Sequence, residues 1–295
     1  MNSIIPETNE RLGIALRILS TLAFAVMAAC IKALGDAVPL GQIVFFRSSV
    51  ALLPLIGFLW WSGEWPRGLS TRRPAGHVIR CSLGAIAMFT SFATIRLLPL
   101  AEATMLSYLA PVILTLLGWV MLKERFDARR ALGVALGVSG GIAFTAPALT
   151  GALPYIGLVG VSLGLVTAVL TAFALVQVRK LTLAGESAGA IAFWFAIVSA
   201  VGGLATLPWG WVLPDAPAAL LLIGTGLAGG LSHIFMTLSF RHAGASALAP
   251  FEYLSVLWAA VLGFVLFTEV PGLAFLLAAP LILAGAYSAR PARLR

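Results

Sequence analysis

The chain has 295 residues, of which 60% are hydrophobic and 10% are charged, and its formal net charge is +8. An ordinary soluble domain is about 45–50% apolar and about 25% charged, so this composition excludes a soluble enzyme, a disordered chain and a coiled coil. A transmembrane β-barrel is excluded as well, because its strands would alternate apolar and polar residues. We therefore expect an all-α, polytopic membrane protein. The position of its positive charges decides whether they indicate nucleic-acid binding or membrane topology.

Apolar runs of about 20 residues are long enough to cross the hydrocarbon layer of a bilayer as helices. The sequence holds ten such runs, and short segments with Pro, Gly or charged residues separate most of them. In chain order, we predict transmembrane helices over residues 12–34, 40–61, 77–96, 100–122, 130–147, 154–178, 189–208, 217–240, 245–267 and 272–289.

The positive residues predict how these helices are oriented in the membrane. If the N-terminus lies inside, 16 of the 19 Lys and Arg residues fall on the cytoplasmic side, and the exceptions are Lys32, Arg47 and Arg96. The opposite orientation would invert this bias, so we expect both termini in the cytoplasm. The basic charge is then explained by topology, and no nucleic-acid partner is predicted.

The second half of the chain echoes the first with an offset of 145 residues. The polar matches at this offset pair Arg96 with Arg241, Tyr108 with Tyr253, and Glu124 with Glu269. Each half holds five helices. After an odd number of crossings the chain is on the other side of the membrane, so the second copy has the opposite orientation to the first. We therefore predict two inverted five-helix repeats over residues 1–148 and 149–295. Inverted repeats occur in secondary transporters, whose substrate site lies near the midplane between the halves. The two matched glutamates lie at helix ends, where we expect them to cap helices or form ion pairs.

Segments at matching positions of this repeat resemble a known family. The motif LSYLAP at 106–111, followed by LKER at 122–125, resembles the fourth and fifth helices of the drug/metabolite transporter (DMT) superfamily in its ten-helix EamA-type branch. The motif APFEY at 249–253, followed by FTEVP at 267–271, resembles the ninth helix of that branch. The resemblance covers essentially the whole chain, and within the branch it is greatest to bacterial inner-membrane exporters of aromatic amino acids.

The resemblance implies a secondary transporter that exports small metabolites across the bacterial cytoplasmic (inner) membrane by alternating access, with aromatic amino acids as the leading substrates. Related members carry other small metabolites, and exporters of these or of cationic drugs are the alternative. The expected partners are a small-molecule substrate and the lipid bilayer, and no oligomer is required. Proton coupling and facilitated diffusion both stay open.

Ionisable side chains deep in a membrane helix cost about 2.5–3.5 kcal/mol to insert, so they are candidates for a substrate site. Glu252 lies in the ninth predicted helix, where it either binds an amino group or a proton or pairs with a neighbouring helix. Arg47 and Lys32 lie on the outer side and are candidates to bind a carboxylate. Snorkelling to the headgroups is the alternative for Lys32, and an ion pair with Asp36 or Glu102 is the alternative for Arg47.

Uncharged residues complete the predicted site. His233, midway along the eighth predicted helix, is either a core histidine or a group that carries hydrogen bonds or a proton. Tyr108 and Tyr253 are placed symmetrically by the repeat, and their hydroxyl groups need partners. The predicted substrate-binding residues are Glu252, Arg47, Tyr108, Tyr253, Phe89, His233, Ser107, Met88 and Lys32.

An intramembrane serine protease is the remote rival. The segment GVSG at 137–140 matches the Gly-x-Ser-Gly pattern of such enzymes, and His233 would be the base for Ser139. However, Ser139 lies inside a glycine-rich helix suited to packing, and two inverted halves have no role in a protease. The sequence holds no metal-ligand cluster and no nucleotide-binding loop, so we predict no enzyme activity, no cofactor and no metal.

Overall fold

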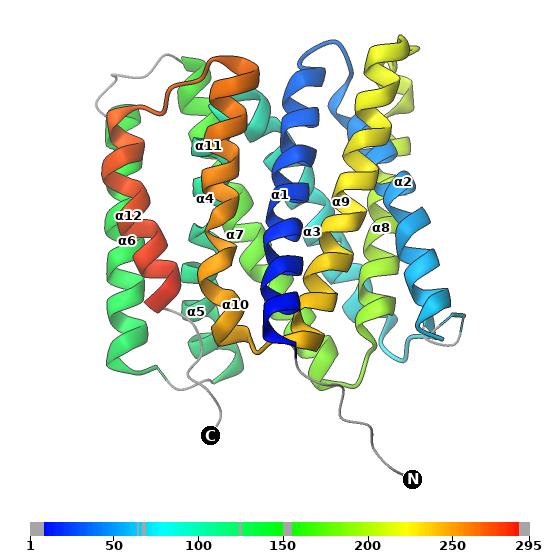
Figure 1. The fold of residues 1–295 in the computed structure, drawn as a ribbon, viewed down its shortest axis with the longest axis horizontal. Helices are drawn as coiled ribbons and strands as arrows, with labels where there is room; N and C mark the ends of the chain where they lie inside the picture. The colour runs from blue at the N-terminus through cyan, green and yellow to red at the C-terminus, as the bar shows by residue number, and fades with distance from the viewer. Residues whose placement is uncertain (1–8, 64, 67–68, 124–125, 150–154, 289–295) are drawn as a thin grey trace.

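The structure, a computed structural model, describes residues 9–63, 65–66, 69–123, 126–149 and 155–288. The helices stand side by side in one bundle (Figure 1), and the described residues include no β-strand. In chain order the helices are α1 (Glu10–Leu34), α2 (Leu40–Trp61), α3 (Pro74–Leu97), α4 (Leu100–Ser107), α5 (Leu109–Leu122), α6 (Ala128–Leu149), α7 (Tyr155–Leu183), α8 (Ala188–Leu204), α9 (Ala216–His242), α10 (Ala245–Glu252), α11 (Leu254–Phe267) and α12 (Leu273–Ser288).

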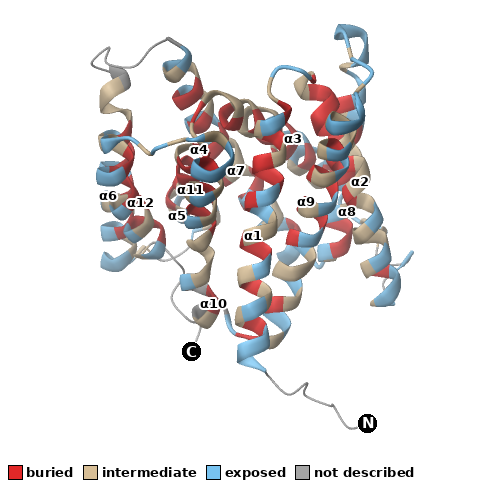
Figure 2. Ribbon diagram, turned by 45° about the horizontal axis from the view of Figure 1, so that its top comes forward, coloured by how far each residue is buried: buried red, intermediate tan, exposed pale blue. Residues whose placement is uncertain are grey.

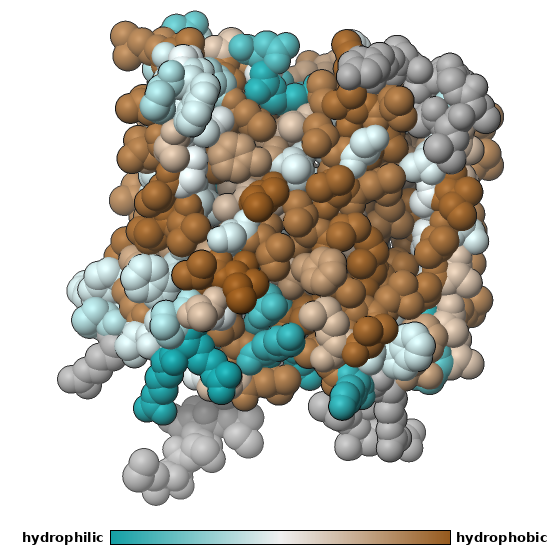
Figure 3. Space-filling view, turned by 180° about the vertical axis from the view of Figure 1, so that it is seen from behind, coloured by the Kyte–Doolittle hydropathy of each residue, from teal (hydrophilic) through white to brown (hydrophobic). Residues whose placement is uncertain are grey.

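The helices suit a membrane in both length and surface. Among the described residues, seven spans are long and apolar enough to cross a bilayer, with α4 and α5 counted as one, and α8 and α12 are shorter apolar helices. Helix α6 completes the ten predicted crossings. Large apolar side chains such as Leu53, Val120 and Leu276 are exposed, and Figure 3 shows a broad hydrophobic band with hydrophilic side chains mainly at the lower end and a smaller group at the upper end. The prediction of an all-α polytopic membrane protein is therefore confirmed.

Helices that are far apart in the sequence pack against each other throughout the bundle. Helix α1 packs on α9, α3 on α7, α6 on α12, and α2 on both α8 and α9. Helices α6 and α12 lie at one end of the bundle and α2 and α8 at the other, with the buried residues on the inward faces between them (Figures 1 and 2). Helix α1 begins and α12 ends on the same side of the bundle, which we call the terminal side, in contrast to the opposite side (Figure 1).

Glycines allow two of these pairs to approach closely. An added Cβ at Gly203 of α8 would lie 2.7 Å from the carbonyl oxygen of Gly41 in α2. An added Cβ at Gly285 of α12 would clash with the backbone of Gly137 in α6. Small residues at such contacts let helix backbones pack directly on each other, so both ends of the bundle are closed by tightly packed pairs.

The predicted helix over residues 100–122 is broken, since α4 ends and α5 begins at Tyr108. Pro111 lies in the first turn of α5, where it has no N–H to donate to the carbonyl group of Ser107, four residues earlier. The N–H of Tyr108 donates to the carbonyl oxygen of Met105 at 2.9 Å, which is the tighter spacing of a 3₁₀ turn. Apolar content alone predicts a continuous helix here, and the proline explains why the helix is interrupted.

The predicted helix over residues 245–267 is broken in the same way at Tyr253, 145 residues after Tyr108. The N–H of Val256 donates to the carbonyl oxygen of Tyr253 at 3.1 Å rather than to that of Glu252. The carbonyl oxygen of Glu252 instead accepts a hydrogen bond from the Tyr108 hydroxyl at 2.5 Å. A side chain that enters the backbone ladder is a common cause of a kink, so this break depends on a tertiary contact.

On the terminal side, the loop between α7 and α8 is fastened to the start of α3. Glu186 of this loop accepts a hydrogen bond from the backbone N–H of Arg72 at 2.9 Å, and its second oxygen lies 3.1 Å from Nε2 of His77. Burial acts to raise the pKa of the Glu186 carboxyl, but hydrogen bonds from Arg72, His77 and Thr71 outweigh it and hold the pKa below its ordinary value. The loop is therefore tied down by an ionised carboxylate.

Candidate functional site

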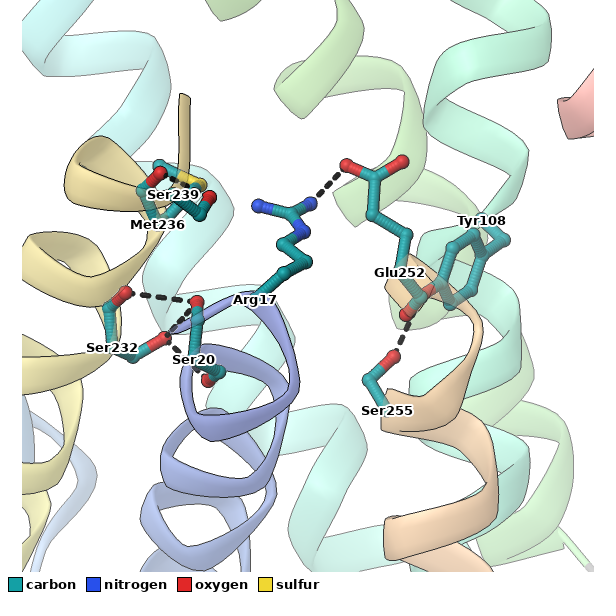
Figure 4. A network of polar contacts seen from close by, with 8 residues as sticks. All are labelled: Arg17, Ser20, Tyr108, Ser232, Met236, Ser239, Glu252 and Ser255. Atoms are coloured by element: carbon teal, nitrogen blue, oxygen red, sulfur yellow. Dashed lines mark hydrogen bonds and ion pairs between the residues drawn. The ribbon is translucent and has the colours of Figure 1, made fainter. Parts of the chain in front are cut away.

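The centre of the candidate site is an ion pair between Arg17 of α1 and Glu252 of α10 (Figure 4). The Arg17 side chain is only 6% exposed, whereas 38% of the Glu252 side chain is exposed. The pair compensates the buried guanidinium, which would be costly alone. The exposed part of the carboxylate leaves room for a second partner beside Arg17.

Tyr108 connects Glu252 to the break in the neighbouring helix. Its hydroxyl donates to the Glu252 carbonyl oxygen at 2.5 Å and lies 2.6 Å from Oγ of Ser255. Its ring centroid is 5.4 Å from that of Tyr253, with the two planes inclined by 40°. The two tyrosines that the repeat predicted as equivalent therefore lie in contact, beside the predicted carboxylate.

A pair of serines continues this polar region towards α9 (Figure 4). The hydroxyl of Ser20 in α1 donates to the carbonyl oxygen of Ser232 in α9 at 2.9 Å, and the Ser232 hydroxyl donates to that of Ser20 at 3.0 Å. Both side chains are buried. The exchange of two hydrogen bonds fixes α1 against α9 next to the ion pair of Arg17.

Arg47 and His233 form a second polar contact, between α2 and α9. Nη2 of Arg47 lies 3.4 Å from Nε2 of His233, and Arg47 is 6% exposed. The predicted alternative partners of Arg47 are engaged elsewhere: Asp36 pairs with Arg96, and Glu102 accepts a hydrogen bond from the N–H of Gly272 at 3.4 Å. The structure thus brings two predicted site residues, Arg47 and His233, together. Neither Asp36 nor Glu102 forms an ion pair with Arg47.

Lys32 lies near the opposite side, in a network of its own. It pairs with Glu269 at 2.5 Å and also donates to the carbonyl oxygens of Ile95 at 3.3 Å and Leu98 at 2.5 Å. Glu269 also accepts the backbone N–H of Leu100 at 2.7 Å. The lysine is therefore held within the protein rather than extended to the headgroups, and Glu269 forms the ion pair expected of it. Its repeat partner Glu124 lies outside the described residues.

The remaining predicted site residues make no polar contact with Glu252 in this structure. Met88 is buried, with its sulfur 3.8 Å from Oγ of Ser48. Phe89 is half-buried against the apolar core. Ser107 is exposed and donates to the carbonyl oxygen of Thr104 in its own helix at 2.6 Å.

Two residues of the site, Arg17 and Ser255, are not among those that the sequence predicts. Arg17 counts towards the cytoplasmic charge bias, although it falls a few residues inside a predicted helix. That position is the available signal, because an arginine inside a helix can face the bundle as readily as the headgroups. Ser255 gives no signal in the sequence, because its polar contact depends on the approach of Tyr108.

The geometry of a serine protease is not present. Ser139 is exposed on α6, which packs on α12 at one end of the bundle, whereas His233 lies on α9 beside α1 and α2 (Figure 1). Within the described ranges, no three His, Cys, Asp or Glu side chains are grouped so as to hold a metal ion.

Comparison with known proteins points to transport. Residues 11–146 match the EamA-like transporter family. The chain is 28% identical over 263 residues to the pseudopaline exporter CntI of Pseudomonas aeruginosa, which covers 88% of this chain and 89% of that protein. It is 27% identical over 262 residues to the S-adenosylmethionine uptake transporter of Rickettsia prowazekii, which covers 88% of this chain and 85% of that protein.

A solved crystal structure has the same fold, with a TM-score of 0.64 over 95% of each chain at 20% sequence identity. The family match runs from α1 nearly to the end of α6, and the similarity to the two transporters extends over most of the chain. Members of the matched family are transporters and not enzymes, which agrees with the bundle and its internal polar site. The chain is therefore similar to EamA-like transporters, through the family match over residues 11–146 and through its transporter relatives over most of its length.

Proposed function

We propose that this transporter exports small amphiphilic metabolites, with aromatic amino acids as the leading substrates, across the bacterial inner membrane by alternating access. The observation that carries the proposal is the partly exposed carboxylate of Glu252, held by Arg17 beside two tyrosine rings in contact. A charged group and an aromatic surface at one place in a membrane bundle suit a solute that has both an amino group and a ring.

The ion pair leaves the site a place for a second cation. When the site is empty, Arg17 neutralises Glu252, so that neither charge is left alone in the bundle. When substrate enters, its ammonium group makes a charge-assisted hydrogen bond with the exposed part of the carboxylate, while Arg17 stays beside it and keeps its counter-charge. Proton coupling is compatible with this arrangement, because a proton can neutralise Glu252 as an ammonium group does; facilitated diffusion is compatible with it as well.

The tyrosine pair supplies the surface for the apolar part of the substrate. The rings of Tyr108 and Tyr253 come from the breaks of two different helices, so they meet a bound ring or aliphatic chain from both halves. Phe89, Met88 and Ser107 extend the wall beside them in this proposal. Aromatic substrates gain from offset contact with such rings by about 0.5–1.5 kcal/mol beyond the area they bury.

Alternating access requires two near-equivalent halves, which we take to be the inverted repeats 1–148 and 149–295. Several features at the same offset of 145 residues support this division. The helix breaks at Tyr108 and Tyr253 match, and so do the left-handed residues Lys123 and Thr268 that end α5 and α11, each with φ of 54°. With both termini in the cytoplasm, the terminal side is the cytoplasmic side, and export proceeds towards the side of Lys32.

The named relatives leave the direction of transport to experiment. The Pseudomonas aeruginosa relative is an exporter, whereas the Rickettsia prowazekii relative is an uptake transporter. We propose export because the sequence resembles exporters, and the test below therefore measures flux in both directions.

The test is flux through proteoliposomes that contain the purified protein. Labelled tryptophan, tyrosine and phenylalanine are compared with alanine and S-adenosylmethionine, with and without a pH gradient, in both directions. We expect saturable flux of the aromatic amino acids, lost in Glu252→Gln and kept in Glu10→Gln, which changes an exposed carboxylate at the start of α1.

Two outcomes would revise the proposal. Absence of flux for every aromatic amino acid would remove them as substrates, and flux that ignores the pH gradient would remove proton antiport and leave facilitated diffusion. Normal flux in Glu252→Gln would show that the ion pair is structural, and the site would have to be sought elsewhere.

A further inference from the structure

A second group of charged side chains lies where α2, α3 and α9 face one another. Arg47 of α2 places Nη2 3.4 Å from Nε2 of His233 in α9. Arg47 and Arg80 of α3 both act electrostatically on the same imidazole. Three basic groups from three helices therefore meet inside the bundle, and nothing described so far assigns a role to Arg80.

Both guanidinium groups occupy places that glycines keep open. The Cζ atom of Arg80 lies 4.4 Å from the centroid of the Phe195 ring in α8, a cation–π distance. A Cβ at Gly84, one turn further along α3, would clash with Nη1 of Arg80. A Cβ at Gly229 of α9 would lie 3.3 Å from Nε of Arg47. The absence of side chains at both glycines lets the arginines lie against the helix backbones.

No carboxylate in the described part of the chain compensates these two arginines. Four acidic side chains there form ion pairs with other partners: Glu252 with Arg17, Glu269 with Lys32, Asp36 with Arg96, and Glu186 with His77. Nε of Arg47 and both Nε and Nη1 of Arg80 are buried without a hydrogen-bond partner among the described residues. A buried charge without a partner is costly in a membrane bundle, so these donors are suited to an anion that arrives from outside the chain.

His233 is the exposed member of this cluster. Its Nε2 lies 3.4 Å from Nη2 of Arg47, so a solute that reaches the imidazole lies beside a guanidinium group. Guanidinium groups hold carboxylates through two parallel hydrogen bonds, and the two arginines offer donors of that kind.

We propose that Arg47, Arg80 and His233 form an anion subsite that binds the carboxylate group of the transported substrate. This inference rests on the proposed function, in which Glu252 binds the amino group of the same molecule. Ser20, three residues after Arg17, exchanges hydrogen bonds with Ser232, the neighbour of His233, so the two subsites lie at a similar depth in the bundle. The substrate class is then zwitterionic rather than simply cationic.

The test is ligand binding to the protein in nanodiscs, measured as thermal stabilisation. Three indole compounds separate the two charges: tryptophan, tryptamine, which lacks the carboxylate, and indole-3-propionate, which lacks the amino group. Leucine, succinate and inorganic phosphate complete the panel. The variants are Arg80→Gln, Arg80→Lys and Arg47→Lys, with Arg96→Gln as matched control, since Arg96 lies on the same helix and pairs with the exposed Asp36.

We expect the apparent Kd for indole-3-propionate to rise about tenfold or more in Arg80→Gln, because a charge-assisted hydrogen bond is lost. The Kd for tryptamine should not change, and Arg96→Gln should behave as the parent protein. Arg80→Gln also removes an uncompensated charge, so the ligand-free protein should unfold at no lower temperature. Arg80→Lys and Arg47→Lys keep the positive charge but lose the two parallel N–H donors of the guanidinium group, so they should weaken carboxylate binding as well.

Equal carboxylate affinity in the parent protein and in both Arg80 variants would overturn the subsite, as would stabilisation by phosphate without any carboxylate. The failure of the proposed function gives a different result. If leucine or succinate binds in an Arg80-dependent manner while no indole compound binds, the anion subsite stands and the aromatic substrates fall. If tryptamine binds equally to Glu252→Gln, the amino-group site falls without affecting the anion subsite.

Discussion

At the scale of single residues, the side chain of Tyr108 has two separable functions. Its hydroxyl donates to the Glu252 carbonyl oxygen at 2.5 Å and lies 2.6 Å from the hydroxyl of Ser255, so it holds the backbone at the break between α10 and α11. Its ring lies against that of Tyr253 and supplies apolar surface. A substitution that removes one atom can distinguish these two functions.

We predict that Tyr108→Phe keeps the ring contact and lowers the free energy of unfolding by about 0.5–1.5 kcal/mol, the usual net value of a hydrogen bond. Ser255→Ala removes one contact of the hydroxyl but leaves its bond to the Glu252 carbonyl, so its effect should be smaller. Chemical unfolding in detergent measures both. Equal stability of the two variants would show that the bond to the backbone contributes little.

The sequence singles out side chains that are unusual for their place. Glu252, Tyr108 and Tyr253 stand out in apolar helices, and the structure brings them together, whereas their role in binding substrate stays a prediction. Arg17 and Arg80 did not stand out, because positive residues near a helix start also serve topology. Hydropathy does not tell whether such a long side chain turns to the headgroups or to the interior, which only the packed helices decide.

At the scale of helices, two adjacent glycines of α8 differ in their surroundings. An added Cβ at Gly203 would lie 2.6 Å from the backbone nitrogen of Phe45 in α2, whereas one at Gly202 would meet nothing within 4 Å. Gly203 therefore sets how closely α2 and α8 pack, and Gly202 does not.

We predict that Gly203→Ala destabilises the protein by about 1–3 kcal/mol, because α2 and α8 must separate. Gly202→Ala should be neutral or stabilising by about 0.5–1 kcal/mol, since alanine favours the helix. Thermal unfolding of the two variants side by side provides the measurement. A similar loss in both would mean that the close approach of the helices is not what stabilises this pair.

The loop between α7 and α8 should respond to acid. Because hydrogen bonds hold the pKa of Glu186 below its ordinary value of 4.5, the unfolded chain binds this proton more tightly than the folded one. The ionised carboxylate therefore contributes stability that is fully present above pH 4.5 and is lost as the pH falls through the lower pKa of the folded state. We expect Glu186→Gln to flatten this part of the profile of unfolding temperature against pH, and identical profiles would refute the contribution.

At the scale of the whole molecule, contacts between distant segments join the helices on the opposite side. Lys32 of α1 joins Glu269, after α11, to the carbonyl groups at the end of α3. An alternating-access cycle must break some of these contacts when the opposite side opens.

We predict that Lys32→Gln opens the opposite side more often. Cys30 lies two residues before Lys32 and is half-buried, whereas Cys81 is buried in α3 and serves as an internal control. A polar maleimide should label Cys30 several-fold faster in the variant, with no change at Cys81, as followed by mass spectrometry. Unchanged labelling of Cys30 would show that the lysine does not control access.

The overall architecture was the most predictable level. The thickness of the bilayer fixes helix length, so apolar runs predicted all ten crossings. The helix breaks were harder to predict from the sequence. Pro111 is visible there, but the break at Tyr253 depends on a hydroxyl group from another helix. The two-repeat division remains a prediction that the matching breaks support.

The hydrogen bond from Tyr108 to the Glu252 carbonyl has a consequence for ion leakage. The residue at one helix break holds the backbone at the other, so neither helix can straighten without releasing its counterpart. A change of shape that starts at one break is therefore felt at the other, at the depth of the charged site. In the proposed transport cycle, this coupling disfavours intermediates in which the two sides open together, and it keeps the membrane sealed to small ions while the cargo crosses.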